Sequence, residues 1–153
     1  MRRKDREILD EQFIEKVLKD SIYGNLGLCD DGAPYVVPMN YVWSDNKIWL
    51  HCASEGRKLD IIRTNPKVCF QVSVETELVT SENPCSYGMF YSSVMIFGIA
   101  SIIEEHEEKS KVLGEILQRY SNKIPHQFTQ EETKRVTVIS IKPDNITCKA
   151  RLK

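Results

Sequence analysis

Long apolar runs are missing from this sequence, since no stretch approaches the ~18 apolar residues that a membrane-spanning helix needs. A surplus of one charge is also missing, because 21 Lys and Arg side chains stand against 22 Asp and Glu. That balance gives no field to attract nucleic acid or an anionic membrane, so we expect neither as a partner. The basic residues 1–7 lead into no apolar run, so they are not expected to form a secretion signal.

The sequence also contains no Cys-x-x-Cys pair, and its number of cysteines, five, is odd. Most of the five cysteines lie in apolar, strand-like runs, where a free Cys behaves as a small hydrophobe. We therefore expect reduced thiols and a cytoplasmic protein. The histidines and cysteines form no local pairs with metal-ligand spacing, so no bound metal is expected.

The common glycine patterns for nucleotide phosphates are absent too. Gly56-Arg57-Lys58 lacks the earlier glycine of a P-loop, and Leu59 stands where Ser or Thr would follow. No Gly-x-Gly-x-x-Gly occurs. A P-loop or Rossmann site is therefore not expected.

What the chain does contain is the composition of one globular domain over residues 1–153, with 41% hydrophobic and 28% charged residues. Two turn signals, Asp30-Asp31-Gly32 and Ser44-Asp45-Asn46, join strand-like runs, and Gly98 predicts a bend within another. We expect strands at 21–29, 35–43, 47–52, 68–74, 90–103, 136–141 and 146–152, helices at 10–20, 56–63 and 105–121, and a polar loop at 76–88. Asp10 is the expected N-cap of the first helix. Because most strands are linked by short turns, the pattern favours a mainly β antiparallel barrel with peripheral helices over a doubly wound sheet.

The segment 48–58 predicts a strand that passes through a short polar loop into a helix. Ser54 and Gly56 stand where the helix begins, and Arg57 and Lys58 place two cations at its N-terminus. Cations are unfavourable there unless an anion binds, because the first backbone N–H groups and the helix dipole are already positive. The pattern therefore indicates a phosphate site, and the alternative is a solvated pair of charges on an exposed turn.

The order of these residues resembles the FMN-binding split-barrel family, which includes pyridoxamine-phosphate oxidase, and within it the nitroimidazole-resistance branch. The resemblance runs through residues 2–7, 27–38, 51–66 and 91–98. It implies a six- to seven-stranded antiparallel split β-barrel that binds FMN, with FAD as the alternative. It also implies a homodimer with the flavin at the subunit interface. The implied activity is a flavin-dependent oxidoreductase that reduces small electron-poor molecules such as nitroaromatics, with NAD(P)H as a possible electron donor.

The resemblance also implies roles for individual residues. Arg57 and Lys58, helped by Ser54, would hold the FMN phosphate. Residues 38–41 would run beneath the isoalloxazine and offer backbone groups to its polar edge, and Ser92 and Ser93 would lie near the ring or the ribityl chain. The full set of expected flavin-contacting residues is Pro38, Met39, Asn40, Tyr41, His51, Cys52, Ser54, Gly56, Arg57, Lys58, Ser92, Ser93 and Val94.

His51 is the residue expected to act in catalysis. The resemblance places it beside the flavin, where an imidazole could donate a proton or hydrogen-bond the ring. The alternative is a strand histidine packed next to Trp49. Cys52 follows directly, but adjacent strand residues point to opposite faces, so a Cys–His hydrolase is rejected.

Two further functions stay open alongside the reductase. One is a non-catalytic flavin carrier or redox-sensing module, and the other is a haem-binding split barrel with His51 as an iron ligand. The arginine-rich substrate clamp associated with pyridoxamine-phosphate oxidase is not evident in residues 142–153, which argues against oxidation of a vitamin B6 phosphate.

Overall fold

The computed structural model describes residues 3–121 and 126–153. The strands are β1 (Glu7–Ile8), β2 (Gly24–Asp30), β3 (Ala33–Met39), β4 (Tyr41–Ser44), β5 (Lys47–Ala53), β6 (Lys67–Val79), β7 (Gly88–Ile103) and β8 (Val136–Arg151). The helices are α1 (Glu11–Asp20), α2 (Arg57–Thr64), α3 (His106–Tyr120) and α4 (Gln130–Lys134), with short 3-10 turns at Lys4–Arg6 and Pro84–Ser86.

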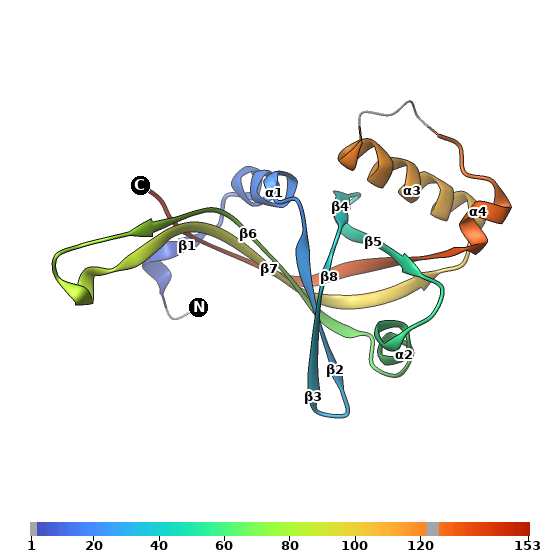
Figure 1. The fold of residues 1–153 in the computed structure, drawn as a ribbon, viewed down its shortest axis with the longest axis horizontal. Coiled ribbons are helices and arrows are strands. Elements are labelled where there is room, and N and C mark those ends of the chain that lie inside the picture. Colours follow the sequence, from blue (N-terminus) through green and yellow to red (C-terminus); the bar gives the residue numbers. More distant parts are fainter. Residues whose placement is uncertain (1–2, 122–125) are drawn as a thin grey trace.

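The strands form one antiparallel eight-stranded sheet in the order β3-β2-β6-β7-β8-β5-β4, with β1 added along β8 (Figure 1). The two end strands, β3 and β4, are consecutive in the chain and are separated only by Asn40. The sheet therefore curls so that its ends meet at Asn40 without pairing to each other, which confirms the predicted split barrel. No helix in residues 3–121 and 126–153 is long and apolar enough to span a membrane.

Local turn chemistry explains the two predicted hairpins. Asp31 and Gly32 have φ of 47° and 83°, and Asp45 and Asn46 have φ of 51° and 55°. Two successive positive φ values make the turn whose twist matches paired strands. The Asp10 side chain accepts hydrogen bonds from the Gln12 and Phe13 N–H groups, as expected for the N-cap of α1.

Three sequence-based boundaries are wrong. Residues 35–43 form two strands rather than one, because β3 pairs with β2 whereas β4 pairs with β5. The loop expected at 76–88 begins only after Val79, where β6 ends. Residues 136–151 form one strand rather than two, because β8 passes Pro143 through an irregularity opposite Gly98 instead of turning.

The sheet has an inner face and an outer face. The inner face carries the main core, which includes Leu26, Phe70, Ile96 and Ile139, all fully buried. Helices α3 and α4 cover one part of the outer face, where Trp49 and Val138 pack with Val112, Leu113 and Ile116 of α3. The part of the outer face formed by β2, β3, β6 and the first half of β7 carries no helix (Figure 1).

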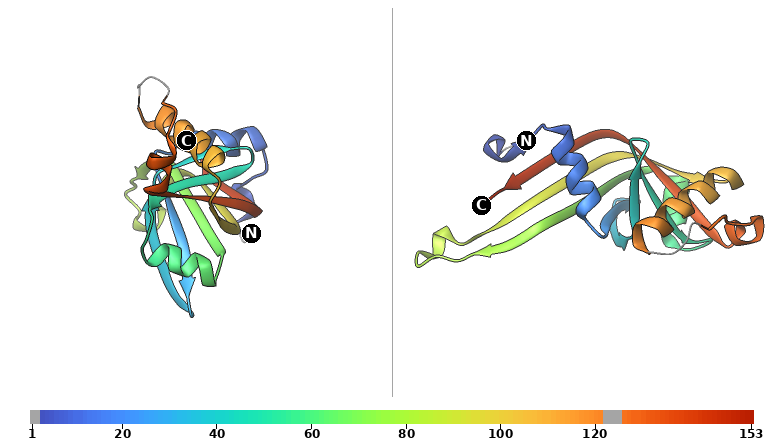
Figure 2. Two further views of the ribbon diagram at one scale, coloured as in Figure 1. Left: turned by 90° about the vertical axis from the view of Figure 1, so that its right-hand side faces the viewer. Right: turned by 90° about the horizontal axis from the view of Figure 1, so that it is seen from above.

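Residues 75–91 form an arm that projects away from the barrel (Figures 1 and 2). It consists of the end of β6, the Pro84–Ser86 turn and the start of β7. Beyond the pair Tyr91–Arg151, β7 pairs only with β6.

Candidate functional site

The loop between β5 and α2 is open and ends in a cationic helix start. Residues 54–57 are exposed, and Gly56 has φ of +127°, a conformation that side-chain-bearing residues rarely adopt. Gly56 is also the N-cap of α2, and no side chain caps this end. The α2 N-terminus thus keeps backbone N–H groups and the positive end of its dipole for an anion.

Arg57 and Lys58 add two charges to this helix end. The Arg57 guanidinium lies 3.3 Å from an Asp30 carboxylate oxygen and 5.0 Å from the centroid of the Tyr35 ring. Lys58 makes no ion pair with any residue that the structure describes. We call Ser54, Gly56, Arg57 and Lys58 the cationic cradle. These four residues lie in the β5–α2 loop and the first turn of α2.

The strand β3 lies beside the cradle through Tyr35. It is an end strand of the sheet, so half of its backbone N–H and C=O groups point away from β2. The side chains of Pro38 and Asn40 are exposed, while Met39 is buried. The prediction that residues 38–41 offer backbone groups to a ligand requires such an unpaired edge.

Tyr41 is placed differently, because it belongs to the core. Its ring is fully buried, and burial raises the pKa of its hydroxyl to about 12. The Tyr41 N–H donates to the Tyr120 hydroxyl at 3.0 Å, and that hydroxyl donates back to the Tyr41 carbonyl at 2.9 Å. Its backbone groups are therefore engaged already, and Tyr41 acts by anchoring the chain after Asn40.

His51 lies on the outer face of β5, opposite Val138 of β8 and on the same side as Trp49. Its Nδ1 is buried without a hydrogen-bond partner, the only such side-chain atom in residues 3–121 and 126–153. Burial lowers the pKa of the imidazole, because the imidazolium would need both N–H groups solvated. His51 is therefore neutral near pH 7 and suits hydrogen bonding better than proton donation.

Cys52 points to the opposite face of β5, as the alternation predicts. Burial raises the pKa of its thiol, and the nearby Lys58 ammonium offsets part of this rise. A protonated thiol is a poor nucleophile, which supports the rejection of a Cys–His hydrolase.

Ser92, Ser93 and Val94 lie far from the cradle in the same chain. Ser92 and Val94 are fully buried on the inner face, and the Ser92 hydroxyl donates to the Glu75 carboxylate at 3.0 Å. Ser93 faces outward, opposite Ser73 of β6. Pro66 lies between α2 and β6, and Ser73 follows it by seven residues along β6. Seven residues of extended chain span ~23 Å. One chain alone therefore does not bring these residues to the cradle.

Sequence reasoning missed the residues that hold the cradle in place. Asp30 and Tyr35 restrain Arg57, and the Asn65 side chain donates to the Cys29 carbonyl at 3.1 Å. These contacts join α2 to the β2–β3 hairpin. No local sequence pattern could reveal these contacts, because each joins two segments that are distant in the sequence.

Residues 10–150 match the family model described as pyridoxamine 5'-phosphate oxidase. The chain belongs to this family. A solved structure of a candidate 5-nitroimidazole antibiotic resistance protein from Bacteroides thetaiotaomicron is 32% identical to it, with a TM-score of 0.83. That match covers 94% of this chain and 85% of the other, consistent with the expected branch.

Two further solved structures share the fold at lower identity. The flavocytochrome Anf3 from Azotobacter vinelandii has a TM-score of 0.88 at 21% identity, over 100% of this chain and 72% of its own. An FAD and haem binding protein from Mycobacterium smegmatis has a TM-score of 0.85 at 16% identity, over 95% and 73%. A protein of Rhizobium meliloti (strain 1021) is 34% identical over 67 residues, and this match spans only 43% of each chain.

Proposed function

We propose that the protein binds FMN through the cationic cradle and reduces small electron-poor molecules, with nitroaromatics such as 5-nitroimidazoles as the leading substrate class. The observation that carries this proposal is the uncapped α2 N-terminus, at which Gly56 leaves the backbone open and Arg57 and Lys58 add two positive charges. A phosphate monoester carries close to two negative charges at neutral pH, so the residues fit this group. Similarity to a nitroimidazole-resistance relative and to flavin-binding proteins supports the same choice.

The bound flavin would supply the electron-transfer chemistry, and this chain would position it. The cradle would hold the phosphate, and the free edge of β3 would offer backbone groups to the polar edge of the ring. His51 Nε2 is the ring nitrogen left for a ligand, since only Nδ1 is buried without a partner. A neutral His51 would donate or accept one hydrogen bond there and hold a substrate or the ring in place.

A haem-binding function has weaker support, although two relatives are described as haem proteins. A histidine that ligates a metal usually donates its other N–H to a hydrogen-bond acceptor, which orients the ring. The buried Nδ1 of His51 has no such acceptor among the residues that the structure describes. Of the two cofactors, flavin therefore fits better.

We also propose that the protein is a homodimer with the flavin between its subunits. Of the two expected ring-contacting serines, Ser92 is buried on the inner face and only Ser93 faces outward. Ser93 lies ~23 Å along the sheet from the end of β6 that follows α2, so a second copy would be needed to bring it and the cradle to one flavin. The uncovered part of the outer face gives that copy a surface on which to pack.

The decisive experiment compares two variants that alter the same helix. In Arg57→Ala/Lys58→Ala we expect the FMN dissociation constant to rise ~10²–10⁴-fold with the fold retained, because two charge-assisted hydrogen bonds are lost. Arg63→Ala is the matched control, since Arg63 lies at the far end of α2 and pairs with Asp60. Fluorescence titration would measure affinity, and mass spectrometry of the co-purified ligand would distinguish FMN from FAD.

Equal FMN affinity in the double variant and the wild type would place the phosphate elsewhere. The reductase and carrier functions are separated by turnover with NAD(P)H and a panel of nitroaromatic acceptors. A protein that binds FMN tightly but reduces no acceptor would be a carrier.

A further inference from the structure

The position of Asn40 depends on the two residues that flank it. Met39 pairs with Gly24 of β2, whereas Tyr41 pairs with Leu50 of β5, and Asn40 takes part in neither pairing. The Asn40 side chain is exposed, while Met39 and Tyr41 are buried. Because the two ends of the sheet meet at Asn40, its place beside a ligand is set by how firmly the chain is held on either side.

Tyr120, the last residue of α3, holds the backbone of Tyr41. Its hydroxyl accepts the Tyr41 N–H at 3.0 Å and donates to the Tyr41 carbonyl at 2.9 Å. In an antiparallel strand the N–H and C=O of one residue point to the same side, so both groups of Tyr41 point away from β5, toward the free edge of β4. One hydroxyl therefore closes this edge directly after Asn40. We call this pair of hydrogen bonds the Tyr120 clamp.

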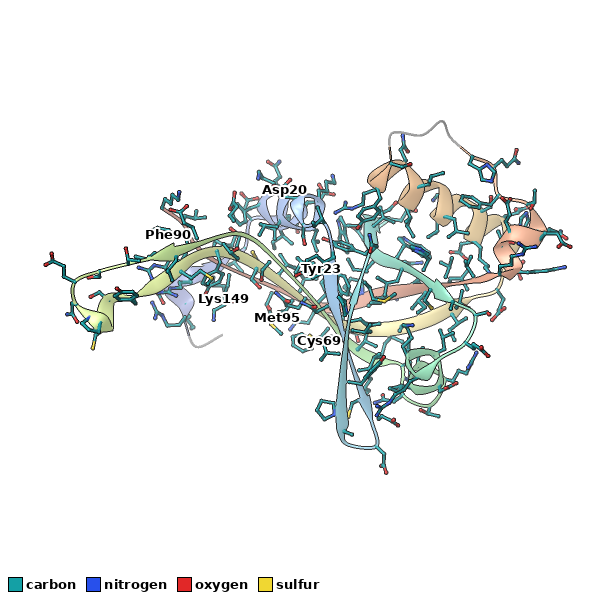
Figure 3. All side chains as sticks on the ribbon, viewed as in Figure 1. Asp20, Tyr23, Cys69, Phe90, Met95 and Lys149 are labelled. Atoms are coloured by element: carbon teal, nitrogen blue, oxygen red, sulfur yellow. The ribbon has the colours of Figure 1, made fainter. Side chains whose placement is uncertain are left out.

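Arg119 fixes the end of α3 that carries the clamp. Its guanidinium donates to three carbonyl oxygens at the C-terminus of α1, those of Leu18, Lys19 and Ser21, at 3.2, 3.0 and 2.6 Å. Figure 3 labels Asp20 at this end of α1. A cation is favoured there, because the last carbonyls of a helix lack intrahelical partners and carry the negative end of the dipole. The guanidinium also lies 4.9 Å from the centroid of the Tyr41 ring and 5.6 Å from that of the Tyr120 ring.

The Tyr120 clamp and the cationic cradle lie at two places along one strand. Tyr41 pairs with Leu50 of β5, and Ser54 of the cradle follows Leu50 by four residues. Four residues of extended chain span ~13 Å. Helix α3 packs on the same strand through Trp49. The strand β5 therefore sets the spacing between the clamp and the cradle, one for each end of an elongated ligand.

We propose that Tyr120 is a positioning residue of the flavin site, and that its hydroxyl holds Asn40 at the polar edge of the isoalloxazine by fixing the Tyr41 backbone. This inference rests on the proposed function for the identity of the ring, whereas the clamp on Tyr41 needs no ligand. Tyr120 acts through Tyr41, and the cradle holds the phosphate separately. Loss of the Tyr120 hydroxyl should therefore change how the ring is held and leave the phosphate contacts as they are.

The first test measures the clamp without a ligand. Tyr120→Phe removes the hydroxyl and keeps the ring beside Arg119. Ser110→Ala is the matched control, because Ser110 also lies on α3 and donates to a backbone carbonyl, that of Phe128, at 3.4 Å. Hydrogen–deuterium exchange at the Tyr41 amide should rise about tenfold in Tyr120→Phe, since the amide loses its acceptor, while the amides of β5 keep their wild-type rates. The control should leave all these rates unchanged. An unchanged rate at Tyr41 in Tyr120→Phe, or an equal rise throughout β5, would overturn the clamp.

The second test separates the ring from the phosphate by comparing FMN with riboflavin. In Tyr120→Phe the dissociation constants of both flavins should rise by the same factor, about tenfold, and the absorption spectrum of the bound flavin should shift. Ser110→Ala should keep the wild-type constants and spectrum. A loss of affinity confined to FMN, or constants and a spectrum equal to those of the wild type, would overturn the positioning role while FMN binding stands. A wild-type protein that binds neither flavin would refute the proposed function and the positioning role with it, and the clamp measured by exchange would remain.

Discussion

His51 combines a half-buried imidazole with an Nδ1 atom that has no hydrogen-bond partner. Replacing it by Ala should leave FMN bound, because the cradle and the sheet surface supply most of the affinity. The absorption spectrum and reduction potential of the flavin should shift if the accessible Nε2 contacts the ring. Anaerobic titration of both proteins would measure the two quantities. A spectrum and potential equal to those of the wild type, together with lower stability, would make His51 a packing residue beside Trp49.

The same variant has a defined effect on acid stability. Burial lowers the pKa of His51 in the folded state, so the unfolded state binds the proton more readily. The free energy of unfolding should therefore fall as pH drops below the ordinary histidine pKa of about 6.5, and level off below the folded-state pKa. His51→Ala should lose this component, as urea titrations at pH 5 and pH 7.5 would reveal. If the free energy of unfolding depended on pH in the same way in the wild type and in His51→Ala, the lowered pKa of His51 would be contradicted.

At the scale of elements, the irregularity between β7 and β8 depends on Gly98. A Cβ at this position would lie 2.2 Å from the Lys142 carbonyl oxygen, which is backbone and cannot easily move. Gly98→Ala should therefore destabilise the protein by about 1–3 kcal/mol. Gly114→Ala is the control: it lies within α3 with no atom within 4 Å of an added Cβ, and it should stabilise by about 0.5–1 kcal/mol. Thermal unfolding of both variants measures the difference, and equal melting temperatures would refute it.

The elements that the sequence predicts correctly are those set by local chemistry. Asp31-Gly32 and Asp45-Asn46 carry the positive φ values that their turns require, and Asp10 caps α1. The break at Asn40 could not be predicted, because it reflects which distant strand each segment pairs with. The continuity of β8 through Pro143 has the same origin, since Gly98 on β7 provides the space. Helix α4 was missed although its signal, the Thr129–Glu132 capping box, is present in the sequence.

The candidate site also has a part that local sequence predicts and a part that depends on contacts between distant segments. The cradle was predictable because Ser54, Gly56, Arg57 and Lys58 are nearly contiguous and one helix start positions them all. Strand alternation turns Ser92 and Val94 inward and Ser93 outward, so a list of consecutive residues mixed two faces of the sheet. The Asp30–Arg57 ion pair and the stacking on Tyr35 depend on the folded sheet.

For the whole molecule, ligand binding and dimerisation should both appear in the melting temperature. A ligand at 100 times its dissociation constant stabilises the folded state by about 2.7 kcal/mol, which for a chain of this size corresponds to roughly 5–10 °C. We expect FMN to give such a shift. Riboflavin at the same concentration should give a much smaller one, because it lacks the phosphate that the cradle would hold. Differential scanning fluorimetry at matched concentrations makes the comparison.

The dependence of the melting temperature on protein concentration tests dimerisation. If the subunits unfold together with their interface, the melting temperature at saturating FMN should fall as the protein is diluted, since mass action then favours separate, unfolded chains. Sedimentation velocity over the same concentrations would show whether a dimer is present before unfolding. A monomer that retains FMN at micromolar concentration would refute the shared site, because within one chain Ser93 lies ~23 Å along the sheet from the end of β6 that follows α2. Equal shifts from FMN and riboflavin would instead refute the phosphate cradle while leaving the dimer in place, so the two parts of the proposal fail separately.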